Sequence, residues 1–197
     1  MSASLSDDWS PAQRRLHWGV AGLVFSAFVI GIVMVPLPLS FLLAKIIAYQ
    51  VHKTIGLLVP PLVLWRLVLR ARRPRPPEEA DIPAWQQRAA GIGHAALYVL
   101  MMVVPVLGYL SASTAPGQIE TTLFLLIPVP HLLGPDEATF NVLRTIHQYL
   151  AWALVLLAAG HTSVALVHHW RGRLVLARML GRATGRPTRA PDHLGPG

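Results

Sequence analysis

Cysteine is absent from the 197 residues of this chain. Without thiolates the chain can form no disulfide, no cysteine-ligated zinc site, no iron–sulfur cluster and no covalent haem link through C-x-x-C-H. Charge is also scarce, because Asp, Glu, Lys and Arg make up 13% of the residues, whereas soluble domains average about 25%. Hydrophobic residues reach 53% and the mean hydropathy is +0.49. This balance indicates an integral membrane protein.

Long uncharged runs predict four membrane-spanning helices, since one span needs about 20 mostly apolar residues. We place the spans at about 17–35, 46–69, 89–113 and 144–170. The Pro60–Pro61 pair must remove backbone hydrogen bonds from the second span. The predicted fold class is all-α, an integral membrane four-helix bundle. It forms one domain over residues 1–182, followed by a basic tail at 183–197.

Two apolar segments need a separate interpretation. The first span follows Arg14 and Arg15, as the apolar part of a signal peptide would. It is too long for that role and lacks an A-x-A-like end, so we expect it to remain a span. Residues 123–135 are apolar but short and contain three prolines. Such a segment is a poor spanning helix, and we interpret it as an interfacial part of a loop.

The basic residues predict the orientation. All but three of the 17 lysines and arginines lie at the N-terminus, at the connection between the second and third spans, or after the fourth span. The exceptions are Lys45, Lys53 and Arg144. By the positive-inside rule, both termini face the cytoplasm. Basic residues interleaved with apolar spans make nucleic acid an unsuitable partner, and membrane lipid the expected one.

Four of the nine histidines fall at two depths of this bundle. His17 opens the first span near the cytoplasmic face, and His52 lies towards the external face of the second. In the fourth span, His147 is external, and His161 lies about 21 Å deeper at 1.5 Å per residue. Fourteen residues come within about 40° of whole helical turns, so both imidazoles share one helix face.

This arrangement suits two metal centres stacked across a membrane, with His52 and His147 outside and His17 and His161 inside. Ionisable groups within spans are costly and usually have partners. Two imidazoles fill both axial positions of a haem iron, whereas a zinc site needs further ligands that the span interiors lack. The simpler alternative is that each histidine only hydrogen-bonds to a neighbouring helix.

The remaining polar groups allow two interpretations each. For His94 we favour helix packing or a hydrogen bond over contact with a haem propionate or a quinone. His168 suits a propionate or quinone contact as well as a lipid headgroup. Arg144 and Lys53 can pair with a propionate or extend to the membrane surface. We expect His131 to be a loop residue, His169 to lie at the membrane interface and His193 to belong to the tail.

The ordered segments RRLHW, YQVHKTIGLL, LWRLVLR, GHAALYVLMMVVPVLGYL, IHQYLAWALVLLAAGH and VHHWRGRLVLARML resemble the prokaryotic cytochrome b561 family. The resemblance runs from about residue 9 to 182. Its most specific features are the histidines fourteen apart in the last span and H-K-x-x-G in the second. It implies a bacterial inner-membrane protein with two non-covalent b haems and four axial histidines, His17, His52, His147 and His161. Gln148 stands where an acidic residue is frequent, and the usual Asp after His168–His169 is missing.

The resemblance leaves three functions to distinguish. The first is an oxidoreductase that oxidises periplasmic superoxide and reduces ubiquinone. The second is an electron-transfer cytochrome subunit that links quinone to another redox partner protein. The third, from a different class, is a haem-free metal transporter or assembly protein. Lys45, Lys53 and Arg144 oppose Glu120, Asp136 and Glu137 on the external side. Attraction of superoxide must therefore depend on local clustering of charge near the haem, because the net external charge is close to zero.

Overall fold

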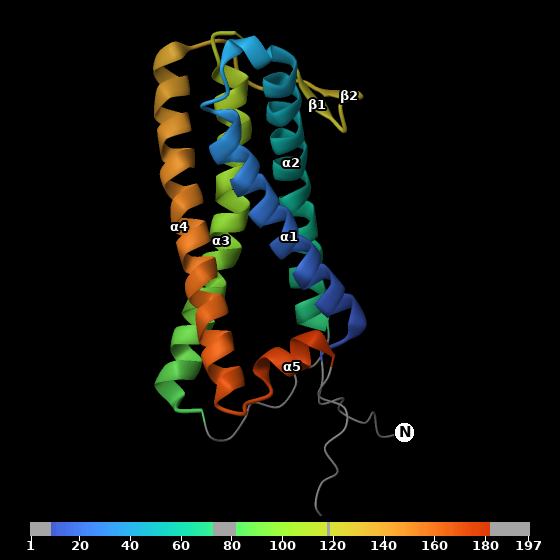
Figure 1. The fold of residues 1–197 in the computed structure, drawn as a ribbon, viewed down its shortest axis with the longest axis vertical. Coiled ribbons are helices and arrows are strands. Elements are labelled where there is room, and N and C mark those ends of the chain that lie inside the picture. The colour runs from blue at the N-terminus through green and yellow to red at the C-terminus, as the bar shows by residue number, and fades with distance from the viewer. Residues whose placement is uncertain (1–8, 73–81, 118, 182–197) are drawn as a thin grey trace, which may run out of the picture.

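Four long helices run up and down through a bundle in the computed structural model, which describes residues 9–72, 82–117 and 119–181 (Figure 1). The helices are α1 (Pro11–Met34), α2 (Leu42–Arg72), α3 (Ala84–Thr114) and α4 (Glu137–Trp170). Each is long and apolar enough to cross a membrane, α2 together with the short 3-10 turn η1 (Leu39–Phe41). The predicted four-helix membrane bundle is confirmed. The predicted tail at 183–197 lies outside the described residues.

The helices extend beyond the predicted spans because polar turns at their ends are also helical. Ser10 caps α1, with its hydroxyl accepting from the Gln13 amide, and Pro11 occupies the first helical position. α4 begins at Glu137, seven residues before the predicted start of its span, and Asp136 caps it. The helix α2 continues through Pro60 and Pro61.

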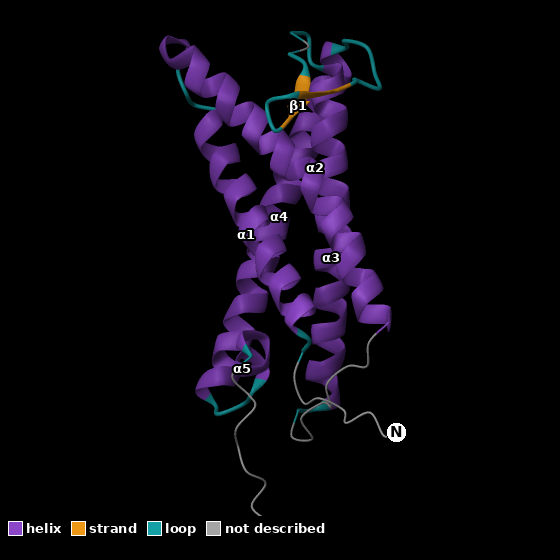
Figure 2. Cartoon of the chain, turned by 90° about the vertical axis from the view of Figure 1, so that its right-hand side faces the viewer, coloured by secondary structure: helices purple, strands orange, loops and turns teal. Residues whose placement is uncertain are grey.

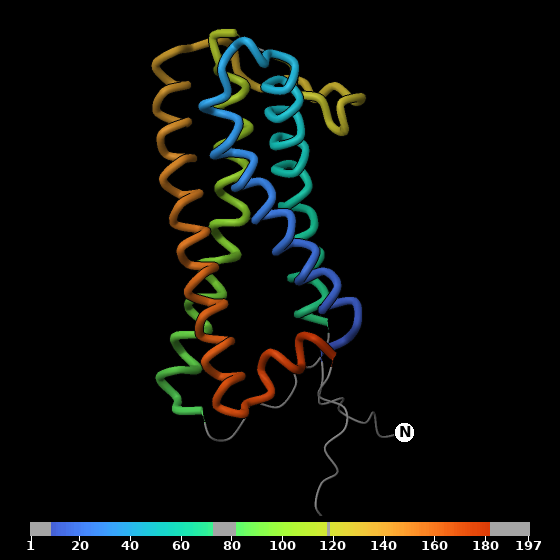
Figure 3. Tube along the Cα trace, in the orientation of Figure 1, coloured from blue at the N-terminus to red at the C-terminus, as the bar shows by residue number. Residues whose placement is uncertain are grey.

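The two ends of the bundle differ. At one end, called the hairpin end, the connection from α3 to α4 contains β1 (Thr121–Leu123), which pairs antiparallel with β2 (Ile127–Val129). The strands lie at this end of the bundle, beside α2 (Figure 2). The apolar loop segment at this end is therefore partly a hairpin. At the other end, called the α5 end, α5 (Val175–Leu180) follows α4 and crosses beneath the bundle towards the start of α1 (Figure 3).

The buried core is a small apolar cluster in the middle of the bundle. Val20, Val59, Val63, Met101, Val104 and Leu154 form it. Leu154 lies seven residues from both His147 and His161, so apolar side chains separate the two histidine levels. Many large apolar side chains on the outside are exposed, Leu156 to 67% among them. In a membrane these side chains face lipid.

Candidate functional site

Towards the hairpin end, α2 and α4 bring His52 and His147 together. Their ring centroids are 6.1 Å apart and their planes are inclined at 81°. The Nδ1 atom of His52 is 2.9 Å from the Ala27 carbonyl of α1, and Nδ1 of His147 is 2.9 Å from the Val104 carbonyl of α3. Because a carbonyl only accepts, each Nδ1 must carry the proton and donate. Each Nε2 then keeps a lone pair for a metal.

Two glycines make room for these rings. A Cβ atom added to Gly108 of α3 would lie 2.9 Å from Cε1 of His147. A Cβ atom added to Gly31 of α1 would lie 3.2 Å from Cε1 of His52. The imidazoles therefore occupy space that any other residue at these positions would fill, most severely at Gly108.

A mostly apolar cavity adjoins the same two rings. Its volume is about 60 Å³, and its walls come from all four long helices. Val24, Phe28, Met101, Pro105 and Leu154 are among its lining residues. The Phe28 ring is fixed edge-on against Trp152, with centroids 4.8 Å apart. The lining is mainly apolar, as the surroundings of a hydrophobic ligand generally are.

Towards the α5 end, α1 and α4 bring His17 and His161 together, with ring centroids 6.4 Å apart and planes inclined at 74°. A third histidine joins them, since the His94 ring of α3 packs edge-on against His161 at 5.1 Å. The Trp18 ring packs against His17 at 5.0 Å. Nδ1 of His17 is buried and has no hydrogen-bond partner among the described residues.

The ring separations of both pairs match the spacing expected for one iron between two imidazoles. Metal–imidazole bonds are about 2.0 Å, and the bonded nitrogen lies roughly 1.1 Å from the ring centroid, so an iron between two imidazoles separates the centroids by roughly 6.2 Å. The His52–His147 separation is 6.1 Å and the His17–His161 separation is 6.4 Å. The 5.1 Å between His94 and His161 is too short for a shared iron. Across the described ranges, no group of three or more His, Asp or Glu side chains is placed to hold a bare metal ion.

The other histidines lie apart from these pairs. Arg173 Nη1 donates to Nδ1 of His168 over 3.3 Å. His131 lies in the loop as expected, with Nε2 3.4 Å from Oγ1 of Thr121. His169 is exposed. His193 falls outside the described residues.

The three basic residues predicted to lie on the external side differ in their surroundings. Arg144 is exposed, whereas Lys53 is half-buried and donates from Nζ to the Ile119 carbonyl over 3.2 Å. Lys45 donates to the Leu37 carbonyl over 2.7 Å and to the Val35 carbonyl over 3.2 Å. Two of the three cations are thus bound to backbone oxygens near the end of α1 and the start of the hairpin segment.

Two polar residues of α2, which the sequence analysis missed, fasten the hairpin beside His52. The Gln50 amide donates to the Glu120 carbonyl over 2.6 Å and accepts from the Thr122 amide over 3.0 Å. The Thr54 hydroxyl accepts from the Phe124 amide over 3.1 Å. Gln50 and Thr54 are four residues apart on either side of His52, a spacing that places them on one helix face. The sequence signal that could have identified them is the four-residue spacing of two polar side chains within an apolar span.

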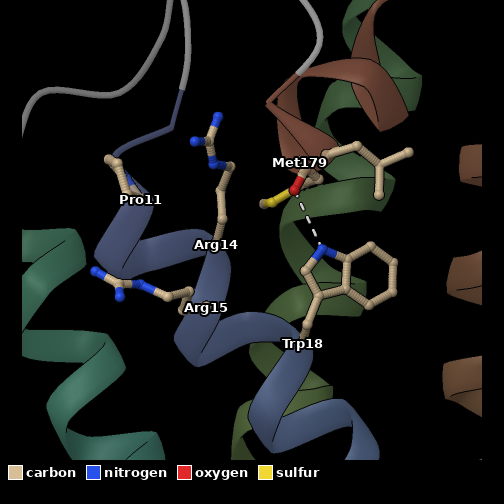
Figure 4. A pocket seen from close by; sticks show the side chains of 6 residues that line it. Pro11, Arg14, Arg15, Trp18 and Met179 are labelled. Carbon is tan, nitrogen blue, oxygen red and sulfur yellow. Dashed lines mark hydrogen bonds between the residues drawn. The ribbon is translucent and has the colours of Figure 1, made fainter.

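A separate groove lies at the α5 end, between the beginning of α1 and the end of α5. Pro11, Arg14, Arg15, Trp18, Met179 and Leu180 line it (Figure 4). The Trp18 indole donates to the Met179 carbonyl over 3.1 Å, which ties α5 to α1. This groove contains no histidine and is distinct from the two histidine pairs.

Comparison with known proteins gives one consistent result. Residues 8–182 match the family described as prokaryotic cytochrome b561. Cytochrome b561 homolog 2 of Escherichia coli (strain K12) is 33% identical over 170 residues, which cover 85% of this chain and 88% of that protein. Cytochrome b561 homolog 1 of the same organism is 29% identical over 121 residues, covering 61% of this chain and 67% of that protein.

Proposed function

The chain belongs to the prokaryotic cytochrome b561 family, whose members are haem-containing membrane proteins of electron transfer, and from this premise we propose that it binds two b haems and carries electrons from superoxide to ubiquinone. The main support for the proposal is that two histidines lie together towards each end of the bundle. Their ring separations are 6.1 Å at the hairpin end and 6.4 Å at the α5 end. His52 and His147 would hold one haem, and His17 and His161 the other.

A bound haem would supply a reversible one-electron couple at each level. The protein's residues would determine the position of each haem and which molecules can approach it. His52 and His147 would together hold the haem at the hairpin end, and the chemistry it would supply with both histidines bound is electron transfer without binding of oxygen or superoxide to the iron. The Ala27 and Val104 carbonyls hold the His52 and His147 rings in one tautomer. Along α4, the fourteen residues from His147 to His161 span about 21 Å, which carries the path across most of the bilayer.

The orientation follows from the basic residues. The α5 end carries most of the arginines, so we place it in the cytoplasm, with both termini, and place the hairpin end in the periplasm of a bacterial inner membrane. Superoxide would approach the hairpin end. Ubiquinone, which resides in the bilayer, would accept electrons from the haem held by His17 and His161.

The test is a pulse of superoxide onto purified protein with ubiquinone in detergent or liposomes. Haem reduction followed by quinol formation, faster than spontaneous dismutation, is the expected result. Haem that stays oxidised through the pulse, but is reduced by added quinol, would contradict superoxide oxidation. That result would identify an electron-transfer subunit that links quinone to another redox partner. A purified protein with no Soret band after haem-replete expression would overturn both forms of the proposal.

A further inference from the structure

Arg66 of α2 lies beside the histidine cluster at the α5 end. It contacts the Tyr98 ring of α3, which lies one helical turn after His94, and His94 packs against His161. Its guanidinium carbon is 5.6 Å from the centroid of the Tyr98 ring of α3. Such cation–π contact holds the flat face of the guanidinium and leaves its N–H edge available. From the sequence alone, Arg66 is one of the basic residues near the connection between the second and third spans, which indicate only the orientation.

A second arginine extends this positive region. Arg70 lies one helical turn after Arg66, on the same face of α2. Both arginines are half-buried. We find no hydrogen bond or ion pair to either one among the described residues. Two cations therefore lie beside the histidine cluster without an anion from the part of the chain that the structure describes.

The described carboxylates are too distant to neutralise them. Glu120, Asp136 and Glu137 all lie at the hairpin end. The Glu120 carbonyl is bound to Gln50, and the sixteen residues from Gln50 to Arg66 correspond to about 24 Å of helix. A guanidinium removed from water inside a membrane bundle needs a counter-charge, because its desolvation is otherwise uncompensated.

We propose that Arg66, assisted by Arg70, binds the propionate carboxylates of the haem held by His17 and His161. This inference rests on the proposed haem at that level. A porphyrin with two propionates brings the carboxylates that the described chain lacks there, and a guanidinium edge matches a carboxylate in bidentate geometry. Arg66 lies six residues before the end of α2, about 9 Å along the helix. At that depth the carboxylate of a cofactor bound between the helices would lie nearer to Arg66 than a lipid headgroup at the membrane surface.

The test uses chain produced without haem and then titrated with haem b or with its dimethyl ester, which lacks free carboxylates. For wild type, one of two sites should bind the ester more weakly than haem. Arg66→Gln should lower the haem affinity of that site by roughly 10- to 100-fold, as expected for loss of a charged hydrogen bond. The same change should leave the affinity for the ester unaltered. Arg72→Gln, in the same helix but exposed, is the matched control and should change neither affinity.

A second measurement covers variants that do not load haem in vitro. In protein loaded during expression, Arg66→Gln should lower the midpoint potential of one haem, because a nearby cation stabilises the reduced form, and Arg66→Lys should recover part of the shift. Equal loss of haem and ester affinity, or an unchanged potential, would show a structural role for Arg66 and overturn the inference. If wild type binds neither haem nor ester, the proposed function itself fails, and this inference fails with it.

Discussion

At the scale of single residues, each imidazole at the hairpin end is fixed from two sides. A carbonyl of a neighbouring helix accepts from Nδ1, and a glycine gives the ring its space. The pair at the α5 end is held differently, since no carbonyl partner reaches Nδ1 of His17 among the described residues. His94 and Trp18 pack there instead. The two proposed haems should therefore differ in potential.

Gly108→Ala tests the space beside His147. The added Cβ would meet the ring at 2.9 Å, so the imidazole must shift, at an overpacking cost of about 1–3 kcal/mol. We expect the variant to lose the haem of the hairpin-end site and to keep the other, measured as the haem-to-protein ratio. Gly91→Ala is the control in the same helix, because a Cβ there meets no atom within 4 Å. Full haem content in Gly108→Ala would contradict this role of the glycine.

Asp136 gives a pH-dependent contribution to stability. The Thr139 hydroxyl donates to its carboxylate, as does the Ala138 amide, and these bonds hold the pKa of Asp136 below the ordinary 3.8. A lowered folded-state pKa means that the stabilisation is complete above the ordinary value and is lost as the pH falls through the folded value. Wild type should therefore melt above Asp136→Asn near neutral pH, with the gap closing below pH 3.8. A gap that stays constant on acidification would rule this out.

At the scale of elements, α2 contributes to the His52–His147 pair, to the attachment of the hairpin and to the proposed propionate site. It carries His52, it binds the hairpin through Gln50 and Thr54, and nearer its end it carries Arg66. The hairpin needs this support because its turn residues Phe124 and Leu125 have φ of 54° and 62°. Bulky residues in that left-handed region are strained, by about 1–2 kcal/mol each. The hydrogen bonds from α2 offset this strain.

Gln50→Ala should therefore loosen the hairpin. It leaves the Glu120 carbonyl and the Thr122 amide without their partner, at a cost of about 1–3 kcal/mol where such groups are buried. We expect faster hydrogen exchange at the Thr122 amide and a lower melting temperature. Gln148→Ala, at an exposed position of α4, should change neither. Unchanged exchange at Thr122 in Gln50→Ala would show that the hairpin is held by other contacts.

Sequence predicted the helices better than the connections. Uncharged runs locate spans because hydrocarbon excludes charge, and the spacing of His147 and His161 indicates one helix face. The hairpin was missed because Phe124–Leu125 lacks the Asn or Gly that marks such a turn. The contact of His94 with His161 was missed as well, since it depends on how α3 sits against α4. The proposed role of Arg66 could not be predicted from the sequence either, because it depends on which residues of other helices surround the side chain.

At the scale of the whole molecule, the bundle separates two polar levels by an apolar middle. The buried cluster around Val59, Met101 and Leu154 lies between the His52–His147 pair and the His17–His161 pair. Apolar side chains there exclude water and ions from the interval between the pairs. The arrangement suits electron transfer across a membrane without passage of ions.

The central claim is that each pair holds one haem, and haem content of four single variants tests it most directly. Purified wild type should contain two haems per chain by pyridine haemochrome assay. His52→Ala and His147→Ala should each keep one haem, with the same spectrum and midpoint potential as one another. His17→Ala and His161→Ala should each keep the other haem. If variants of one pair retained different haems, or if any one variant lost both while keeping its helix content, the assignment would be wrong.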